Sequence, residues 1–246
     1  MNEIKTAWIK YGLVGASAIV SVIILSCTVY AIKARDVISV TGLGEETFVS
    51  DKIVWTGRYQ TETPNRLEGY KEMERCQKIV ADYLAQSGID AKEITFSFIS
   101  ADKNMEPIYN SLGNYSGSRF VGYRLEQSFT IVSNEVDKVE TVSREISSVI
   151  AKGVNIMSNS PEYYYTKLDD LKLTLIEKAS KDARARALKV VENAGAKLGK
   201  ASSASLGVFQ ITSATGNEDY LYGGTFNTWS KEKKASVTVR MSYKLK

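Results

Sequence analysis

Hydrophobic and polar positions recur along the chain with two periods, which predict strands and helices. Apolar residues at every second position predict strands at residues 121–131 and 235–245, each with one apolar and one polar face. Apolar residues at helical spacing predict helices at residues 66–87, 136–150 and 169–194. The last of these carries a stripe of small residues, Ala179, Ala183 and Ala187, which indicates close packing against a sheet or a partner helix.

The segments between these elements complete a pattern of strands and turns. Residues 36–60 are predicted to be extended, and Gly42 and Gly44 suggest a bulge or bend within them. Further strands are predicted at residues 94–99, 154–165 and 201–211. Residues 101–118 are rich in Asn, Gly and Ser, which predicts a loop or the tip of a long hairpin. The predicted fold class is α+β, with antiparallel sheets covered by helices on one face.

An apolar run from Tyr11 to Ile32 contains no charged residue and is long enough for one N-terminal transmembrane helix. A short tail, one span and a large remainder are typical of a signal-anchor or a signal peptide. Three alternatives stay open: an uncleaved anchor, cleavage after Ala31, or lipidation at Cys27, which ends a segment similar to a lipobox. Each alternative places the residues after about 36 outside the cytoplasm.

The predicted domain organisation follows from this run. Residues 1–35 form a cytoplasmic tail and transmembrane signal-anchor (or signal peptide), and residues 36–246 form an extracytoplasmic domain. An alternative divides the latter into two subdomains near residues 101–119. The chain is 43% hydrophobic and 24% charged, which is ordinary for a folded domain with its own core.

The composition excludes several classes of function. The sequence contains no histidine, which excludes Ser-His-Asp and Cys-His catalytic sets and histidine-containing zinc sites. The net charge of +4 is too small to indicate a nucleic-acid partner. We therefore expect no enzyme activity, no metal and no cofactor. The basic residues between Lys181 and Lys189 fit phosphate or anionic lipid headgroups, although a solvated helix face is the simpler interpretation.

One loop stands out for its aromatic content. Residues 212–230, here called the aromatic loop, contain Tyr220, Tyr222, Phe226 and Trp229 in a segment otherwise composed like a loop. Exposed aromatic side chains at this density indicate a contact surface for a partner or for another subunit. Packing of the rings onto the core of the protein itself is the alternative. The four aromatic residues are the candidate contact residues.

Four segments in sequence order resemble one known family, the SIMPL-domain proteins. They are residues 38–45 (ISVTGLGE), 120–124 (FVGYR), 179–187 (ASKDARARA, continuing through 196–200) and 235–239 (ASVTV). The resemblance extends from Val37 to Leu245. Members of the family include bacterial periplasmic immunogenic proteins and proteins of oxidative-stress defence.

The resemblance implies a SIMPL-like fold, export or membrane tethering, self-assembly, and no established catalytic site. The expected function is that of a single-pass protein of the bacterial inner membrane with its main domain in the periplasm. Its expected partners are further copies of itself, in a ring- or cage-like scaffold of the cell envelope, and the membrane through residues 11–32. Secretion after cleavage near Ala31, or a lipoprotein at Cys27, are alternative locations. The alternative function is a monomeric or dimeric binding module of an envelope stress-response pathway, which binds an envelope protein through the aromatic loop.

Overall fold

The computed structural model describes residues 15–17, 19–28, 37–216 and 222–246, which form an α+β fold with antiparallel sheets. The chain divides into two compact units. The first combines the described residues of Met1–Glu45 with Thr174–Val208 and Ser236–Lys246, and the second combines Glu46–Leu173 with Phe209–Ala235. Both units are therefore built from segments that lie far apart in the sequence. Residues 101–119 lie within the second unit.

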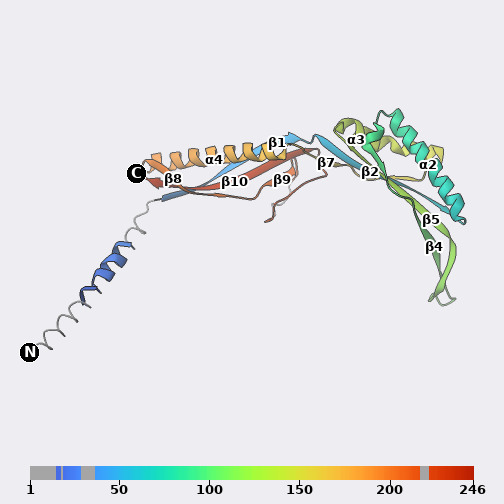
Figure 1. The fold of residues 1–246 in the computed structure, drawn as a ribbon, viewed down its shortest axis with the longest axis horizontal. Coiled ribbons are helices and arrows are strands. Elements are labelled where there is room, and N and C mark those ends of the chain that lie inside the picture. Colours follow the sequence, from blue (N-terminus) through green and yellow to red (C-terminus); the bar gives the residue numbers. More distant parts are fainter. Residues whose placement is uncertain (1–14, 18, 29–36, 217–221) are drawn as a thin grey trace, which may run out of the picture. The chain divides into compact units, whose positions relative to one another are not determined.

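The first unit is organised around strand β10 (Glu232–Leu245), which lies between β1 (Val37–Val49) and β8 (Leu198–Leu206) in one sheet. Strand β9 (Gln210–Ser213) also pairs with β10. Helix α4 (Leu168–Asn193) runs along the strands in Figure 1. The alternation predicted for the last strand is confirmed, because Ala235, Val237, Val239 and Tyr243 are all buried.

Gly42 and Gly44 lie where β1 meets α4. A Cβ atom on Gly42 would lie 2.1 Å from the carbonyl oxygen of Ala179, and one on Gly44 would lie 2.2 Å from that of Leu175. Strand β1 runs through both glycines, and neither has a positive φ. The close approach of the helix backbone explains why both positions are glycine. The Leu43 N–H donates to an Asp182 carboxylate oxygen at 2.8 Å, and this bond lowers the pKa of Asp182.

The second unit contains a sheet of order β3–β5–β2–β6, formed by Ile94–Phe96, Tyr115–Ser133, Lys52–Thr63 and Ile156–Ser158. Strand β4 (Ser100–Tyr109) pairs with β5, and β7 (Glu162–Tyr164) pairs with β2. Helices α2 (Arg66–Gln86) and α3 (Val136–Glu145) pack on one face of this sheet around Trp55 and Phe129. Two 3-10 helices, Ala91–Glu93 and Ile146–Lys152, complete the unit.

The boundaries of these elements follow mostly from local chemistry. Helix α2 begins after Asn65, whose side chain accepts the N–H of Leu67 at 2.9 Å, and it ends just before Gly88, which has a φ of 81°. The strand predicted at residues 154–165 is instead two short strands, β6 and β7. Pro161, which has no N–H to give to a ladder, lies between them.

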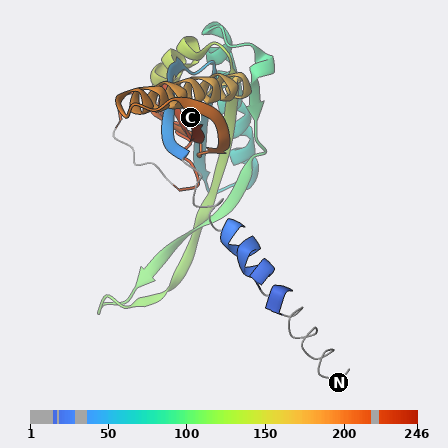
Figure 2. The same cartoon turned by 90° about the vertical axis from the view of Figure 1, so that its left-hand side faces the viewer.

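Strands β4 and β5 form a long hairpin that covers residues 101–118. Of the two interpretations of this segment, the hairpin is confirmed. The far end of the hairpin extends well beyond α2 and α3 in Figures 1 and 2. Its side chains are consequently exposed on both faces near the turn.

Residues 15–17 and 19–28 are helical, with exposed side chains. No helix among the described residues is long and apolar enough to cross a membrane. Residues 11–14, 18 and 29–32 of the predicted span, including Ala31, lie outside the described residues.

Substitution of Gly42 by alanine should destabilise the first unit. The added methyl group would force helix α4 away from β1, and overpacking of this kind costs about 1–3 kcal/mol of unfolding free energy. Urea denaturation of the variant measures this loss. Gly223→Ala is the matched control, because nothing lies within 4 Å of a Cβ at that position. Equal unfolding midpoints for the two variants would contradict the packing argument.

Candidate functional site

The described part of the aromatic loop is bound to the second unit by its backbone. The N–H of Ile211 in β9 donates to the carbonyl of Thr225 at 2.7 Å, and the N–H of Asn227 donates back to the carbonyl of Ile211 at 2.9 Å. Ile211 and Phe226 thereby form a parallel bridge. The N–H of Tyr163 also donates to the carbonyl of Thr228 at 2.6 Å. These bonds give the loop a fixed course.

A buried amide and a buried ammonium group hold the base of the loop. Asn227 is completely buried, and its side-chain oxygen accepts the N–H of Ser230 at 2.9 Å. Lys233 in β10 is only 2% exposed, and its Nζ donates to the Asn227 carbonyl at 2.5 Å. A buried cation is costly without hydrogen bonds, so this contact ties strand and loop together.

The aromatic side chains of the loop, in contrast, face outward. Tyr222 is fully exposed and Trp229 is 66% exposed. Phe226 is half exposed, and its ring centroid lies 6.5 Å from that of Tyr164. Tyr220 lies outside the described residues. The rings of Tyr222 and Trp229 therefore leave most of their surface to solvent, although the backbone beneath them is fixed.

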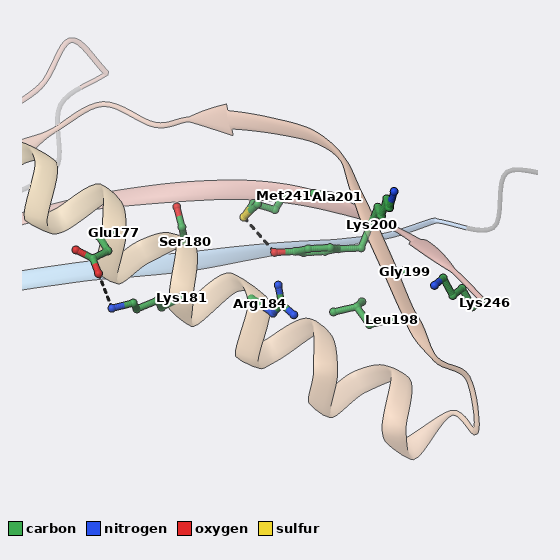
Figure 3. A pocket seen from close by; sticks show the side chains of 11 residues that line it. Glu177, Ser180, Lys181, Arg184, Leu198, Gly199, Lys200, Ala201, Met241 and Lys246 are labelled. Carbon is green, nitrogen blue, oxygen red and sulfur yellow. Dashed lines mark hydrogen bonds and ion pairs between the residues drawn. The ribbon is translucent and has the colours of Figure 1, made fainter.

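A second feature is a basic cleft of about 640 Å³ between α4 and the strands of the first unit. Figure 3 shows Arg184 extending from the helix toward the strands, with Lys200 and Lys246 on the strand side. Leu198, Met241 and Tyr243 supply an apolar part of the lining. The cleft thus offers cations and apolar surface to an anion.

The other basic side chains of this helix segment are paired. Lys181 lies 2.5 Å from Glu177, and Arg186 lies 2.8 Å from Asp182, both one helical turn away. Exposed pairs of this kind contribute little stability. They agree with a solvated helix face for most of the segment between Lys181 and Lys189, of which Lys181 and Arg184 line the cleft.

The buried thiol of Cys76 shows no sign of activation. Cys27 and Cys76 are both free, the first exposed and the second buried. Burial, and then the nearby Glu72 carboxylate, raise the pKa of the Cys76 thiol to about 11, so it is protonated near neutral pH. Burial likewise raises the pKa of Tyr59, whose hydroxyl donates to Gln127 at 2.6 Å. Within the described ranges, no three Cys, Asp or Glu side chains gather as metal ligands.

Two features of interest were not identified from the sequence. Lys233 lies in a charged run, residues 231–234, and charge alone favours a solvated face there, although the alternation of the last strand places it on the same face as Ala235 and Val237. The exposed end of the β4–β5 hairpin was described only by its Asn, Gly and Ser content. The absence of charge from residues 107–118 is the signal that distinguishes it.

The comparison with known families agrees with this fold. The model of the SIMPL family, described as a protein of unknown function (DUF541), matches residues 38–243. The chain belongs to the SIMPL family. This match includes both units and the described part of the aromatic loop, whereas residues 1–37 lie outside it. No curated protein matches the chain.

The Cys76 thiol should make this SIMPL protein less stable at alkaline pH. An unfolded thiol ionises near pH 9 and the folded thiol near pH 11, so the unfolded state loses its proton first. The free energy of unfolding should therefore fall from about pH 9 to about pH 11, and Cys76→Ala should reduce that fall. Urea titrations across this range measure it, with Cys27→Ala as control. Identical pH profiles for the Cys76→Ala variant and the unchanged chain would refute the assignment.

Substitution of Asn227 by alanine should loosen the aromatic loop. It leaves the Ser230 N–H without its acceptor, and a buried donor left unsatisfied costs about 1–3 kcal/mol. We expect a lower urea midpoint and faster proteolysis within residues 212–230. Asn193→Ala, at an exposed amide near the end of α4, should change neither quantity. A protease-resistant loop in the Asn227→Ala variant would show that other contacts hold the loop.

Proposed function

We propose that this SIMPL protein is tethered to a membrane, that its main domain lies outside the cytoplasm, and that copies of it assemble into a ring- or cage-like scaffold of the cell envelope. The observation that carries the proposal is the aromatic loop. Its backbone is fixed by hydrogen bonds and a buried lysine, while the rings of Tyr222 and Trp229 stay exposed. Because the backbone beneath the rings is already ordered, association costs little further conformational entropy, and the exposed rings supply contact area.

The tether is supported by the apolar run at residues 11–32. In its described helical part the large side chains are exposed, among them Ile19, Val22 and Leu25. The hydroxyls of Ser21 and Thr28 donate to the carbonyls of Ser17 and Ile24, at 2.8 and 2.7 Å. These hydroxyls are thus satisfied within the helix, as a lipid environment requires. We place the tether in the bacterial inner membrane and the domain in the periplasm; cleavage after Ala31 and lipidation at Cys27 are the alternatives.

Self-assembly has a second support in the sheet that contains β10. Its strand order places β1 and β8 at the two edges. Edge strands offer unpaired backbone groups to another chain. Contacts that are made head to tail close into rings when the rotation between subunits allows it, and closure removes such edges.

The proposal assigns no catalytic step and no cofactor. The sequence lacks histidine, so no imidazole can act as a base. The buried thiol of Cys76 is protonated at neutral pH and is therefore a poor nucleophile. Nucleic acid is left out as a partner because the net charge is only +4.

The exposed rings also favour a second candidate function. A monomer or dimer would present the same side chains of Tyr222, Phe226 and Trp229 to an envelope protein. The chain would then act as a binding module in an envelope stress response. The mass of the particle separates the two functions.

Light scattering on the detergent-extracted full chain should give one large, defined mass. The variant with Tyr222, Phe226 and Trp229 all changed to serine should give a much smaller mass, with unchanged circular dichroism. Leu67→Ser is the matched control, since Leu67 is about as exposed as Trp229 but lies on α2. It should leave the mass unchanged.

Three other results would change the interpretation. A monomer or dimer in the unchanged chain would reject the scaffold and favour the binding module. A large mass that survives the triple substitution would place the contact elsewhere. A chain without residues 1–35 that still forms the oligomer would show that the folded domain assembles by itself, whereas loss of the oligomer would assign assembly to the tether.

A further inference from the structure

The far end of the β4–β5 hairpin has an unusual combination of exposure and composition. Residues 107–118, here called the hairpin tip, contain no charged side chain, in a chain that is 24% charged. Leu112 at the turn is 83% exposed, and Tyr109 and Tyr115 are 61% and 65% exposed. An exposed turn needs solubility, which charged side chains usually supply. The tip instead exposes apolar and aromatic side chains among uncharged Asn, Ser and Gly residues.

Four backbone N–H groups of the turn are hydrogen-bonded within the turn itself. The Asn110 side-chain oxygen accepts the N–H groups of Leu112 and Asn114, at 3.0 and 2.9 Å. The Asn110 N–H donates to the Asn114 carbonyl and the Gly113 N–H to the Asn110 carbonyl, both at 2.9 Å. A segment that leaves water must carry its backbone hydrogen bonds with it, and this turn does so for these four N–H groups.

The side chains are layered along the hairpin. The register places Leu112 at the turn, Tyr109 opposite Tyr115 next, and Glu106 opposite Arg119 after the uncharged stretch. The two tyrosine rings lie 6.4 Å apart, and the Arg119 guanidinium lies 2.8 Å from the Glu106 carboxylate. The exposed leucine at the turn, the amphipathic rings and the charged pair follow the order of increasing polarity from the acyl region of a lipid bilayer outward.

We propose that the hairpin tip is a shallow bilayer anchor, which inserts Leu112, Tyr109 and Tyr115 into the interface of a lipid bilayer. This contact goes beyond the proposed function and is separate from residues 11–32. A bilayer fits better than a second copy of the chain, because Pro107 has no N–H and interrupts the edge of β4 that another strand would pair with. With so few apolar side chains, the tip by itself binds weakly and reversibly, and it adds to another attachment.

The test places a fluorescent reporter at the tip of the full chain. Ser111→Cys, in a Cys27→Ser background, is labelled with nitrobenzoxadiazole, while the buried, protonated Cys76 stays unlabelled. The chain is mixed with vesicles of phosphatidylcholine and phosphatidylglycerol that carry spin-labelled acyl chains. We expect a blue-shifted emission and at least about 2-fold quenching at Ser111. A label at Ser147→Cys, exposed in the same unit, should show neither change.

A second variant tests which side chain causes the insertion. Leu112→Asp puts a charge at the apex of an exposed turn without altering its hydrogen bonds, and it should abolish the blue shift and the quenching. Leu67→Asp, at an exposed position on α2, should preserve both. Circular dichroism confirms that each variant is folded.

The outcomes separate this inference from the tether. If the label at Ser111 keeps the emission that it has in water while the chain co-floats with the vesicles, the tip anchor is overturned and the tether is retained. Release of the Leu112→Asp chain from the vesicles would support the tip and count against the tether. Shielding of the Ser111 label without vesicles, increasing with protein concentration, would overturn the bilayer in favour of a contact between copies.

Discussion

The close approach of α4 to β1 is the constraint on which the first unit depends. Gly42 and Gly44 leave no side chain between strand and helix, and the facing residues Ala179 and Ala183 are completely buried. Backbone atoms therefore meet directly, and the short distances increase dispersion contacts where apolar side-chain area is small. The bond from the Leu43 N–H to Asp182 fixes the register of the strand against the helix. Such packing tolerates very little added volume.

Periodicity predicted the regular elements well because the core of each unit lies on one side of its sheet. The buried faces of α2 and β10 appeared in the sequence as apolar residues at helical and alternating spacing, and the SIMPL family assignment rested on four short segments in order. The role of Gly42 could not be predicted in the same way. A glycine in a strand is compatible with a bulge or with a close neighbour, and the neighbour, α4, lies more than a hundred residues away in sequence.

The candidate surfaces could be predicted less completely. The density of aromatic residues identified the loop that contains Trp229, but its exposure depends on how β9 and Lys233 hold the loop backbone. The charge of Lys233 favours an exposed position, whereas its place in the alternation of β10 favours the buried one that it occupies. The hairpin around Leu112 was one of two alternatives from composition. The hydrogen bonds within its turn depend on Asn110, whose side-chain bonds no sequence pattern specified.

The placement of β10 at the centre of its sheet has a consequence for how the protein matures. This strand pairs with β1 and β8, yet it lies almost two hundred residues after β1 in the chain. Contacts of such long sequence separation form slowly, because a large loop must close before they are made. When the chain emerges with its N-terminus first, β1 keeps an unpaired edge until β10 has emerged. Maturation is therefore the period in which this protein is most exposed to aggregation, and the arrival of its final strand brings that period to an end.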